Sequence, residues 1–410
     1  MKNILTLILI ILFGSNVFFA KELQVILKNT ANIERNDEMI VITRDSVIKI
    51  LGEISADKTL IVYDSKKSLP SQLDDLNGDG KWDELAFLAD FKPQEQLTLA
   101  IKIINKAESP KYGLRTNIRF AKTIKTGKIY EEAGSATRLK GFVVDSTKHY
   151  PQFEGPGWEN DKVAFRNYFD ERNGIDIFGK TTSKMVLDSV GIKEEYHYLK
   201  PWGMDVLKVG NSLGAGSLGV CYKDSLYRIS AKEGASFKIV AEGPVRSVLD
   251  LDFAKVQTGN LTFALKHRIS IVAGEYGYRS EVHVMHPSDS FLLATGLVNL
   301  HCKELFTAAT DGCNIFYTHD KQSENNDILG LGIILKKNDF IDWFQTTNNG
   351  SGVTNTFAIK MPVTSSLPVK FIFIAGWELS SPLFSDKKLF EGYLKQQAVK
   401  FENPIVYQLK

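Results

Sequence analysis

Residues 149–180 bring together aromatic, basic and acidic side chains that could bind a sugar and move a proton. An aromatic ring stacks on the apolar face of a sugar, an arginine forks onto a carboxylate, and tyrosine or histidine transfers a proton. The predicted strand Val163–Phe169 places Arg166 and Tyr168 on one face. This pattern is typical of a site for an anionic sugar. The candidates in this segment are His149, Tyr150, Trp158, Glu159, Arg166, Tyr168, Asp170 and Arg172.

A second cluster follows within residues 194–205, in a loop interrupted by Gly and Pro. Its candidates are Tyr196, His197, Lys200, Trp202 and Asp205. Each of these side chains could instead belong to the core or to an ion-pair network, because such networks also gather charged groups. The two clusters together favour function, since loops this rich in titratable and aromatic groups are seldom kept for packing alone. No zinc-site spacing links the histidines.

The loop from Asp75 to Glu84 predicts a structural calcium site. Calcium binds six to eight oxygen atoms, and alternating Asp and Asn side chains around a Gly turn supply them. The twelfth position is Ala86, where an EF-hand has Glu, and strands rather than helices are expected on both sides. A metal-free Asp/Gly turn is the alternative. The predicted ligands are Asp75, Asn77, Asp79, the carbonyl of Lys81, and Asp83 or Glu84.

The composition is that of a soluble globular protein. The chain has 410 residues, 43% of them hydrophobic, and its 50 basic and 48 acidic residues give a net charge of +2. No basic block stands out, which argues against nucleic acid as a partner. No segment after the N-terminus is apolar enough to predict a membrane span.

The first twenty residues resemble a cleaved secretory signal, with Lys2, the apolar run Ile4–Phe13 and a small residue at Ala20. The run is shorter than the roughly 20 residues that span a bilayer. A buried first strand or an uncleaved anchor is the alternative. No cysteine lies nearby, so a lipid anchor is not expected. The sequence therefore predicts a secreted or periplasmic protein.

The remaining chain predicts a mostly β protein with two domains. Short apolar runs within residues 21–106 indicate a small N-terminal β-sandwich. Residues 107–410, which begin with a polar connector, are expected to form a large antiparallel β-sandwich carrying the site, with one helix at Asp386–Val399. Cys302 and Cys313 could pair, although free thiols are at least as consistent with the sequence.

Three stretches resemble a known family: GPGWENDKVAFRNYFDERNGIDIFGK, DLNGDGKWDEL and EGPVRSVLDLDF. They are similar to the secreted Bacteroidota proteins grouped as domain of unknown function 4861. The resemblance covers most of the chain and implies a galactose-mutarotase-like β-sandwich found among enzymes that degrade polysaccharides. It also implies similarity to an oligosaccharide dehydratase acting on ulvan, which removes water from a terminal uronate.

Elimination of water from a uronate requires a cation for the carboxylate, a base for the C5 proton and an acid for the departing hydroxyl. We expect Arg166 or Arg172 in the first role. His149 or His197, paired with Tyr168 or Tyr196, would act as base or acid. Trp158 and Trp202 would stack on sugar rings, with the other candidates binding substrate. The alternatives are a glycoside hydrolase, using Glu159 with Asp170 or Asp205, and a non-catalytic sugar-binding protein.

Overall fold

Antiparallel β-strands make up about half of the chain and helices only a small part, which confirms the mostly β prediction. The computed structural model describes residues 22–125, 129–141, 152–192, 195–364 and 366–410. The predicted signal Met1–Ala20 lies outside these residues. No helix among the described residues is both long and apolar enough to cross a membrane.

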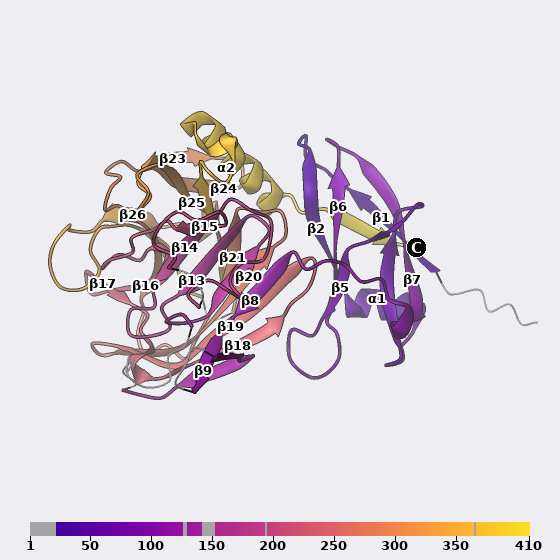
Figure 1. The fold of residues 1–410 in the computed structure, drawn as a ribbon, viewed down its shortest axis with the longest axis horizontal. Coiled ribbons are helices and arrows are strands. Elements are labelled where there is room, and N and C mark those ends of the chain that lie inside the picture. Colours follow the sequence, from indigo (N-terminus) through magenta and orange to yellow (C-terminus); the bar gives the residue numbers. More distant parts are fainter. Residues whose placement is uncertain (1–21, 126–128, 142–151, 193–194, 365) are drawn as a thin grey trace, which may run out of the picture.

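Two small sheets form the N-terminal sandwich around a core of apolar residues (Figure 1). Helix α1 (Arg44–Leu51) buries Val47 and Leu51 in this core and was not predicted. The first sheet, in the order β29–β1–β7–β3–β4, consists of Val406–Leu409, Glu22–Lys28, Gln96–Asn105, Lys58–Tyr63 and Ser68–Leu69. The second sheet, in the order β2–β6–β5, consists of Arg35–Thr43, Glu84–Phe91 and Ser71–Asp74.

The C-terminal strand corrects the predicted domain boundary. Strand β29 leaves the large domain and pairs antiparallel with β1, with Val25 opposite Leu409, as the yellow strand in Figure 1 shows. The small domain therefore contains both ends of the described chain, and the large domain ends before β29. The short apolar alternation of β29 carries no signal of its partner, because pairing between distant strands is not encoded locally.

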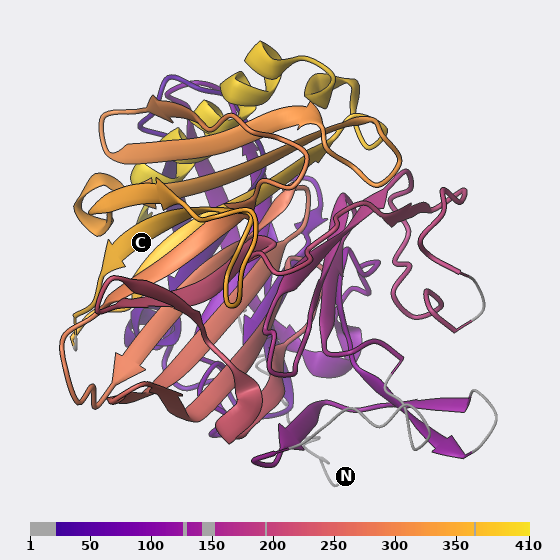
Figure 2. The ribbon, with the colours of Figure 1, turned by 90° about the vertical axis from the view of Figure 1, so that its left-hand side faces the viewer.

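A nine-stranded sheet forms one layer of the large domain (Figure 2). Its order is β11–β18–β19–β20–β21–β28–β25–β24–β23. Its strands are Ser135–Arg138, Ala235–Ala241, Arg246–Thr258, Leu261–Val272, Gly277–Met285, Val369–Trp377, Ile328–Lys336, Cys313–Lys321 and Phe306–Ala309.

Two five-stranded sheets form the opposing layer. The first has the order β15–β14–β13–β12–β8 and consists of Gly203–Asp205, Ile175–Lys180, Val163–Asn167, Gly157–Asn160 and Thr116–Arg119. The second has the order β17–β16–β22–β27–β26 and consists of Ser225–Arg228, Ala215–Tyr222, Leu292–Val298, Thr356–Pro362 and Asp342–Gln345. A small hairpin joins β9 (Ala121–Lys125) and β10 (Ile129–Glu132).

The main core lies between these layers, where one face of each sheet contributes apolar side chains such as Phe165, Leu251, Leu293 and Phe373. Burial of this face is the dominant favourable term for the sandwich. Helix α2 (Lys387–Glu402) covers part of the outer face of the nine-stranded sheet with Phe390 and Leu394, close to the predicted helix. Short 3-10 helices occupy Lys106–Glu108, Ala231–Glu233, Lys337–Asp339 and Pro382–Phe384. All three cysteines are free.

Candidate functional site

A buried arginine organises the outer face of the first five-stranded sheet. Arg166 on β13 lies directly opposite Asp176 on β14, so the two side chains project from the same face. The guanidinium donates to Asp176 Oδ2 at 2.5 Å and to the Tyr168 hydroxyl at 2.8 Å. It is also 3.0 Å from a Glu154 oxygen and 3.6 Å from an Asp205 oxygen. Only 2% of the Arg166 side chain is exposed, so its charge acts on these neighbours.

Two aspartates share this arginine, and the pKa of one of them is raised. Asp176 accepts hydrogen bonds from Arg166 and, at 2.7 Å, from the Tyr168 hydroxyl. Burial raises the pKa of Asp205 well above the ordinary value of 3.8, and the neighbouring Asp176 carboxylate raises it further. The raised pKa favours the protonated form of Asp205. Burial, followed by the charge of Asp176, also raises the pKa of Tyr168, which keeps this phenol protonated.

Glycine at position 203 lets β15 approach β14 closely enough to place Asp205. Gly203 has φ +130°, and a Cβ atom there would lie 1.8 Å from the carbonyl oxygen of Gly179. The register that follows sets Asp205 opposite Phe178, two residues along β14 from Asp176. A side chain at position 203 would thus displace one of the two site carboxyls.

The segment between β14 and β15 folds back over Arg166. The Tyr196 hydroxyl accepts a hydrogen bond from Arg166 Nη1 at 3.0 Å, and its carbonyl accepts one from the Asp205 amide at 2.8 Å. The rings of Tyr196 and Trp202 pack edge-on against Phe178. This cover leaves a hollow of about 210 Å³, lined by Tyr168, Asp176, His197, Asp205, Leu207, Lys208, Val209, Gly210 and Glu324.

The rim of the hollow carries an exposed histidine and an exposed lysine. His197 Nδ1 lies in hydrogen-bonding contact with Glu195, which leaves the opposite ring nitrogen available to a ligand. The His197 side chain is 61% exposed. Lys208 is exposed at the same rim and supplies a cation. The hollow therefore combines two aspartate carboxyl groups, an imidazole and a lysine amino group.

Two predicted substrate-binding residues are instead buried, which corrects their expected roles. Trp158 has no exposed surface and packs against Phe165 and Tyr278, because β12 turns this residue toward the main core. Glu159 is equally buried and pairs with Lys180 Nζ at 2.7 Å. Neither side chain can contact a bound sugar.

Other predicted residues lie around the hollow but do not line it. Asp170 and Arg172 pair with each other, and the Arg172 guanidinium lies 4.1 Å from the centre of the Tyr168 ring. Lys200 and half-buried Trp202 belong to the covering segment. Of the predicted candidates, the hollow is lined by Tyr168, His197 and Asp205, and Arg166 and Tyr196 support it from behind. His149 and Tyr150 lie outside the described residues.

Asp176, Lys208 and Glu324 also line the hollow. Lys208 and Glu324 were not predicted, whereas Asp176 belongs to the crowded segment of residues 149–180 but was given no role there. The turn at residues 169–172 places Asp176 opposite Arg166 in a hairpin register. Glu324 comes from a loop after β24 that meets this sheet through a hydrogen bond from its amide to the Val206 carbonyl. No local sequence pattern indicates that contact.

The predicted calcium loop is held by its own side chains and joins the two domains. Asp75 accepts from the amides of Gly78 and Gly80, and Asp83 accepts from those of Leu76 and Asn77. Asn77 and Asp79 also accept backbone amides, at positions 79 and 81. Among the described residues no group of three His, Cys, Asp or Glu side chains converges for a metal ion.

The predicted closing ligand of this loop has another partner. Glu84 pairs with Arg246 Nη2 at 2.5 Å, across the domain junction. In this arrangement Asp75 and Asp83 accept hydrogen bonds from backbone amides, and Glu84 pairs with an arginine. The role of the Lys81 carbonyl stays a prediction, as does calcium binding itself.

If calcium binds this loop, we expect the midpoint of thermal unfolding to rise by several degrees on adding calcium and to fall with a chelator, since a ligand of the native state stabilises it. The Asp75→Asn variant should lose that response. A midpoint that is identical in calcium and in chelator would contradict the calcium prediction. The Asp45→Asn variant, altered on exposed helix α1, is the matched control.

Comparison with known proteins places the chain in a family. It is 24% identical over 399 residues to "Uncharacterized protein P7" of Formosa agariphila, covering 92% of this chain and 91% of that protein. The fold resembles a solved glycosyl hydrolase family 38 protein from Enterococcus faecalis, at a TM-score of 0.50 and 10% identity, over 95% of this chain and 47% of that one.

An alpha-mannosidase structure from Enterococcus faecalis matches at a TM-score of 0.49 and 10% identity, over 95% of this chain and 46% of that one. The chain thus spans about half the length of the solved structures it matches, and at this identity the likeness concerns the fold. Over residues 27–406 the sequence matches the model described as "Domain of unknown function (DUF4861)", and the chain belongs to that family.

Proposed function

We propose that the protein is a carbohydrate-active enzyme that eliminates water from a terminal uronate of an oligosaccharide. The observation that carries the proposal is the hollow over β13–β15, where Asp205, whose pKa is raised, lies beside Asp176 and shares the lining with the imidazole of His197 and the amino group of Lys208. Its volume of about 210 Å³ suits one sugar ring. Solved neighbours with the same fold include a glycosyl hydrolase family 38 protein, which supports a carbohydrate ligand.

The residues can be assigned to the three tasks of the elimination. Lys208 neutralises the substrate carboxylate, which makes the adjacent C5 proton more acidic. His197 takes the C5 proton, and the C5–H electrons form the C4–C5 double bond. Asp205 gives its proton to the departing C4 hydroxyl, which leaves as water. Proton exchange with solvent then returns His197 and Asp205 to their starting states.

Arg166 and Tyr168 act as positioning residues in this scheme. Arg166 contacts both aspartates, and Tyr168 donates a hydrogen bond to Asp176, so these two residues hold the carboxyl groups in place beside each other. A neighbouring carboxylate raises the pKa of a carboxyl group, because two negative charges in contact repel each other.

A glycoside hydrolase is the second candidate, favoured by the fold of the glycosyl hydrolase family 38 neighbour alone. Hydrolysis by two carboxylates uses carboxyl groups about 5–5.5 Å apart, or about 6.5–9.5 Å apart with a water between them. Asp176, the carboxyl group beside Asp205, is held by Arg166 at 2.5 Å and by Tyr168 at 2.7 Å. Glu159, the other proposed carboxylate, is buried. Neither group is free to act as the second carboxylate, which favours elimination over hydrolysis at the hollow.

The test is incubation with a disaccharide that has a non-reducing-end uronate. Elimination should remove the mass of one water and add ultraviolet absorbance from the unsaturated sugar. Hydrolysis would add one water without a chromophore, and either that result or an unchanged mass with uronate disaccharides of several linkages would contradict the proposal. The Asp205→Asn variant, which cannot donate the proton, should be slower by roughly 100- to 10,000-fold.

The same aspartate predicts the pH dependence. Because the folded pKa of Asp205 is raised, activity should fall as pH rises through that value, since the acid is then ionised. The native state binds the proton more tightly than the unfolded state, so this group's contribution to stability is lost as pH rises from 3.8 toward the folded pKa. Urea unfolding of wild type and Asp205→Asn across this range measures that contribution.

Asp339→Asn is the matched control, because burial raises the pKa of Asp339 too, and this residue lies on a 3-10 helix away from the hollow. It should leave the alkaline fall in activity unchanged. If the residual activity of Asp205→Asn still falls as the pH rises, the group that protonates the departing hydroxyl is a residue other than Asp205.

A further inference from the structure

The outer face of the nine-stranded sheet carries a ladder of alternating charges. Lys238, Asp250, Arg268, Glu281 and Lys370 lie directly opposite one another on β18, β19, β20, β21 and β28. Side chains opposite each other on antiparallel strands interact directly. Alternate positions on the same strands, such as Leu251 and Ile269, face the main core. The ladder is therefore the solvent face of this sheet, on the side of the sandwich away from the hollow.

Fixed ion pairs hold most of the ladder in place. Arg268 forks onto Asp250 with hydrogen bonds of 2.7 and 2.8 Å, and Lys370 lies 2.7 Å from Glu281. Lys266, in the next row, reaches Asp250 at 3.4 Å. Paired arginine and carboxylate groups are rigid, so the surface they form is preorganised for a ligand.

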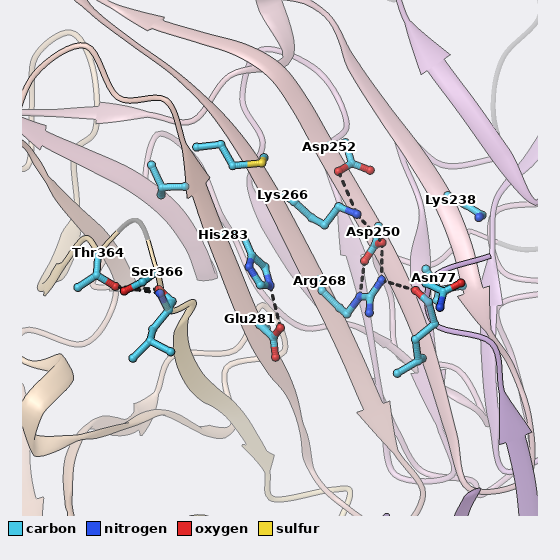
Figure 3. A pocket seen from close by; sticks show the side chains of 15 residues that line it. Asn77, Lys238, Asp250, Asp252, Lys266, Arg268, Glu281, His283, Thr364 and Ser366 are labelled. Carbon is cyan, nitrogen blue, oxygen red and sulfur yellow. Dashed lines mark hydrogen bonds and ion pairs between the residues drawn. The ribbon is translucent and has the colours of Figure 1, made fainter. Parts of the chain in front are cut away.

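A groove of about 610 Å³ runs over this ladder (Figure 3). Asn77 from the small domain stands on one side, and Thr364 and Ser366 from the turn after β27 stand on the other. The small-domain wall is fixed, because Arg268 Nη2 donates to the Leu76 carbonyl at 2.9 Å. The groove is nearly three times the size of the hollow, so it has room for more than one sugar ring.

One cation of the groove lacks an anionic partner. Each lining carboxylate has at least one cation within 4.0 Å, whereas exposed Lys238 pairs with no carboxylate of the described residues. His283, hydrogen-bonded to Glu281 at 2.8 Å, adds a further nitrogen to the lining. The groove thus offers an unneutralised ammonium group among alternating donors and acceptors.

We propose that this groove binds a stretch of an acidic polysaccharide chain, as a second carbohydrate site apart from the hollow. Sugar hydroxyls both donate and accept hydrogen bonds, which matches the alternation of the ladder, and a sugar carboxylate or sulfate matches Lys238. The ligand class rests on the proposed function. The site would hold the protein on its polymer and raise the local concentration of chain ends.

Two other ligand classes suit the groove less well. A nucleic acid needs many cations for its closely spaced phosphates, whereas Lys266 and Arg268 are paired with carboxylates of the lining and Lys238 alone has no carboxylate partner among the described residues. A peptide could not add as a strand, because β18 to β21 each already have a neighbour on both sides.

Native gel electrophoresis in gels containing polygalacturonate, or neutral dextran as the comparison, tests the proposal. Polygalacturonate should retard the wild type, and the Lys238→Gln/Lys266→Gln variant should bind it at least about fivefold more weakly. The matched control is Lys387→Gln/Lys395→Gln, which removes two exposed lysines of α2. The proposal would be overturned if polygalacturonate retarded the two double variants equally. It would also be overturned if dextran retarded the wild type as strongly as polygalacturonate does.

The Asp205→Asn variant, altered in the hollow, tests polymer binding at the groove independently of the proposed enzymatic activity. Asp205→Asn should lose turnover and keep its retardation, because its substitution lies on the opposite layer. Loss of retardation in Asp205→Asn would assign polymer binding to the hollow and overturn the groove. The Lys238→Gln/Lys266→Gln variant should keep the wild-type rate on a disaccharide, and its thermal midpoint verifies that it folds.

Discussion

The Arg166→Met variant should lose about 3–5 kcal/mol of unfolding free energy and nearly all activity. Removing one member of a buried ion pair leaves the remaining charge without compensation, which is the most destabilising change at such a site. Arg166 is 2% exposed and contacts three carboxylates, at Asp176, Asp205 and Glu154. Urea unfolding followed by tryptophan fluorescence measures the stability, and turnover is measured under conditions in which the variant remains folded.

A second buried arginine provides the matched control. Arg35 in the small domain has no exposed surface and pairs with Glu38 at 2.7 Å, far from the hollow. Arg35→Met should lose a similar stability but keep the turnover of the folded fraction. Arg166→Lys should recover part of the stability of Arg166→Met and little of its activity, because an ammonium group cannot reproduce the fork to Asp176 and Tyr168. Equal turnover in the two arginine-to-methionine variants would contradict a role for Arg166 in the site.

Much of the site followed from the alternation of side chains along one strand. The period of two in residues 163–169 predicts that Arg166 and Tyr168 share a face, and in the structure Tyr168 lines the hollow while Arg166 contacts its hydroxyl from behind. The Gly and Pro residues of the second cluster predict a loop, and that loop brings His197 and Asp205 to the same place. These signals are local, so a single sequence carries them.

The predictions that were wrong, for Trp158 and Glu159, concern a strand that is buried on both faces. Strand β12 is buried at all four positions, because the main core covers one face and the segment after β14 covers the other. In such a strand, the sequence does not indicate whether Trp158 faces the core or a ligand. Contacts between distant segments, such as Glu324 with the hollow or β29 with β1, depend on the assembled fold and leave no local pattern.

Glu159→Gln should lose about 3–5 kcal/mol of unfolding free energy, because it leaves the buried Lys180 ammonium without its carboxylate. Glu159 also accepts the amides of Val186 at 2.9 Å and Leu187 at 2.8 Å, so it anchors the start of the segment that covers the hollow. Activity should fall through misplacement of that segment. Urea unfolding gives the stability, and the dependence of rate on substrate concentration gives the change in binding.

A double variant distinguishes this structural role from catalysis. Burial lowers the pKa of Lys180, so its charge is held in place mainly by Glu159. Adding Lys180→Met to Glu159→Gln removes the unpaired charge and should restore a measurable part of the stability, since pairs in contact are not additive. If Glu159 served only as a catalytic carboxylate, Glu159→Gln would have the wild-type unfolding free energy and would lose turnover. Adding Lys180→Met would then restore neither stability nor turnover. The coupling energy is the difference between the stability loss of the double variant and the summed losses of the two single variants. A double variant that loses less than this sum indicates that Glu159 anchors the covering segment, and simple additivity indicates that it reacts with the sugar.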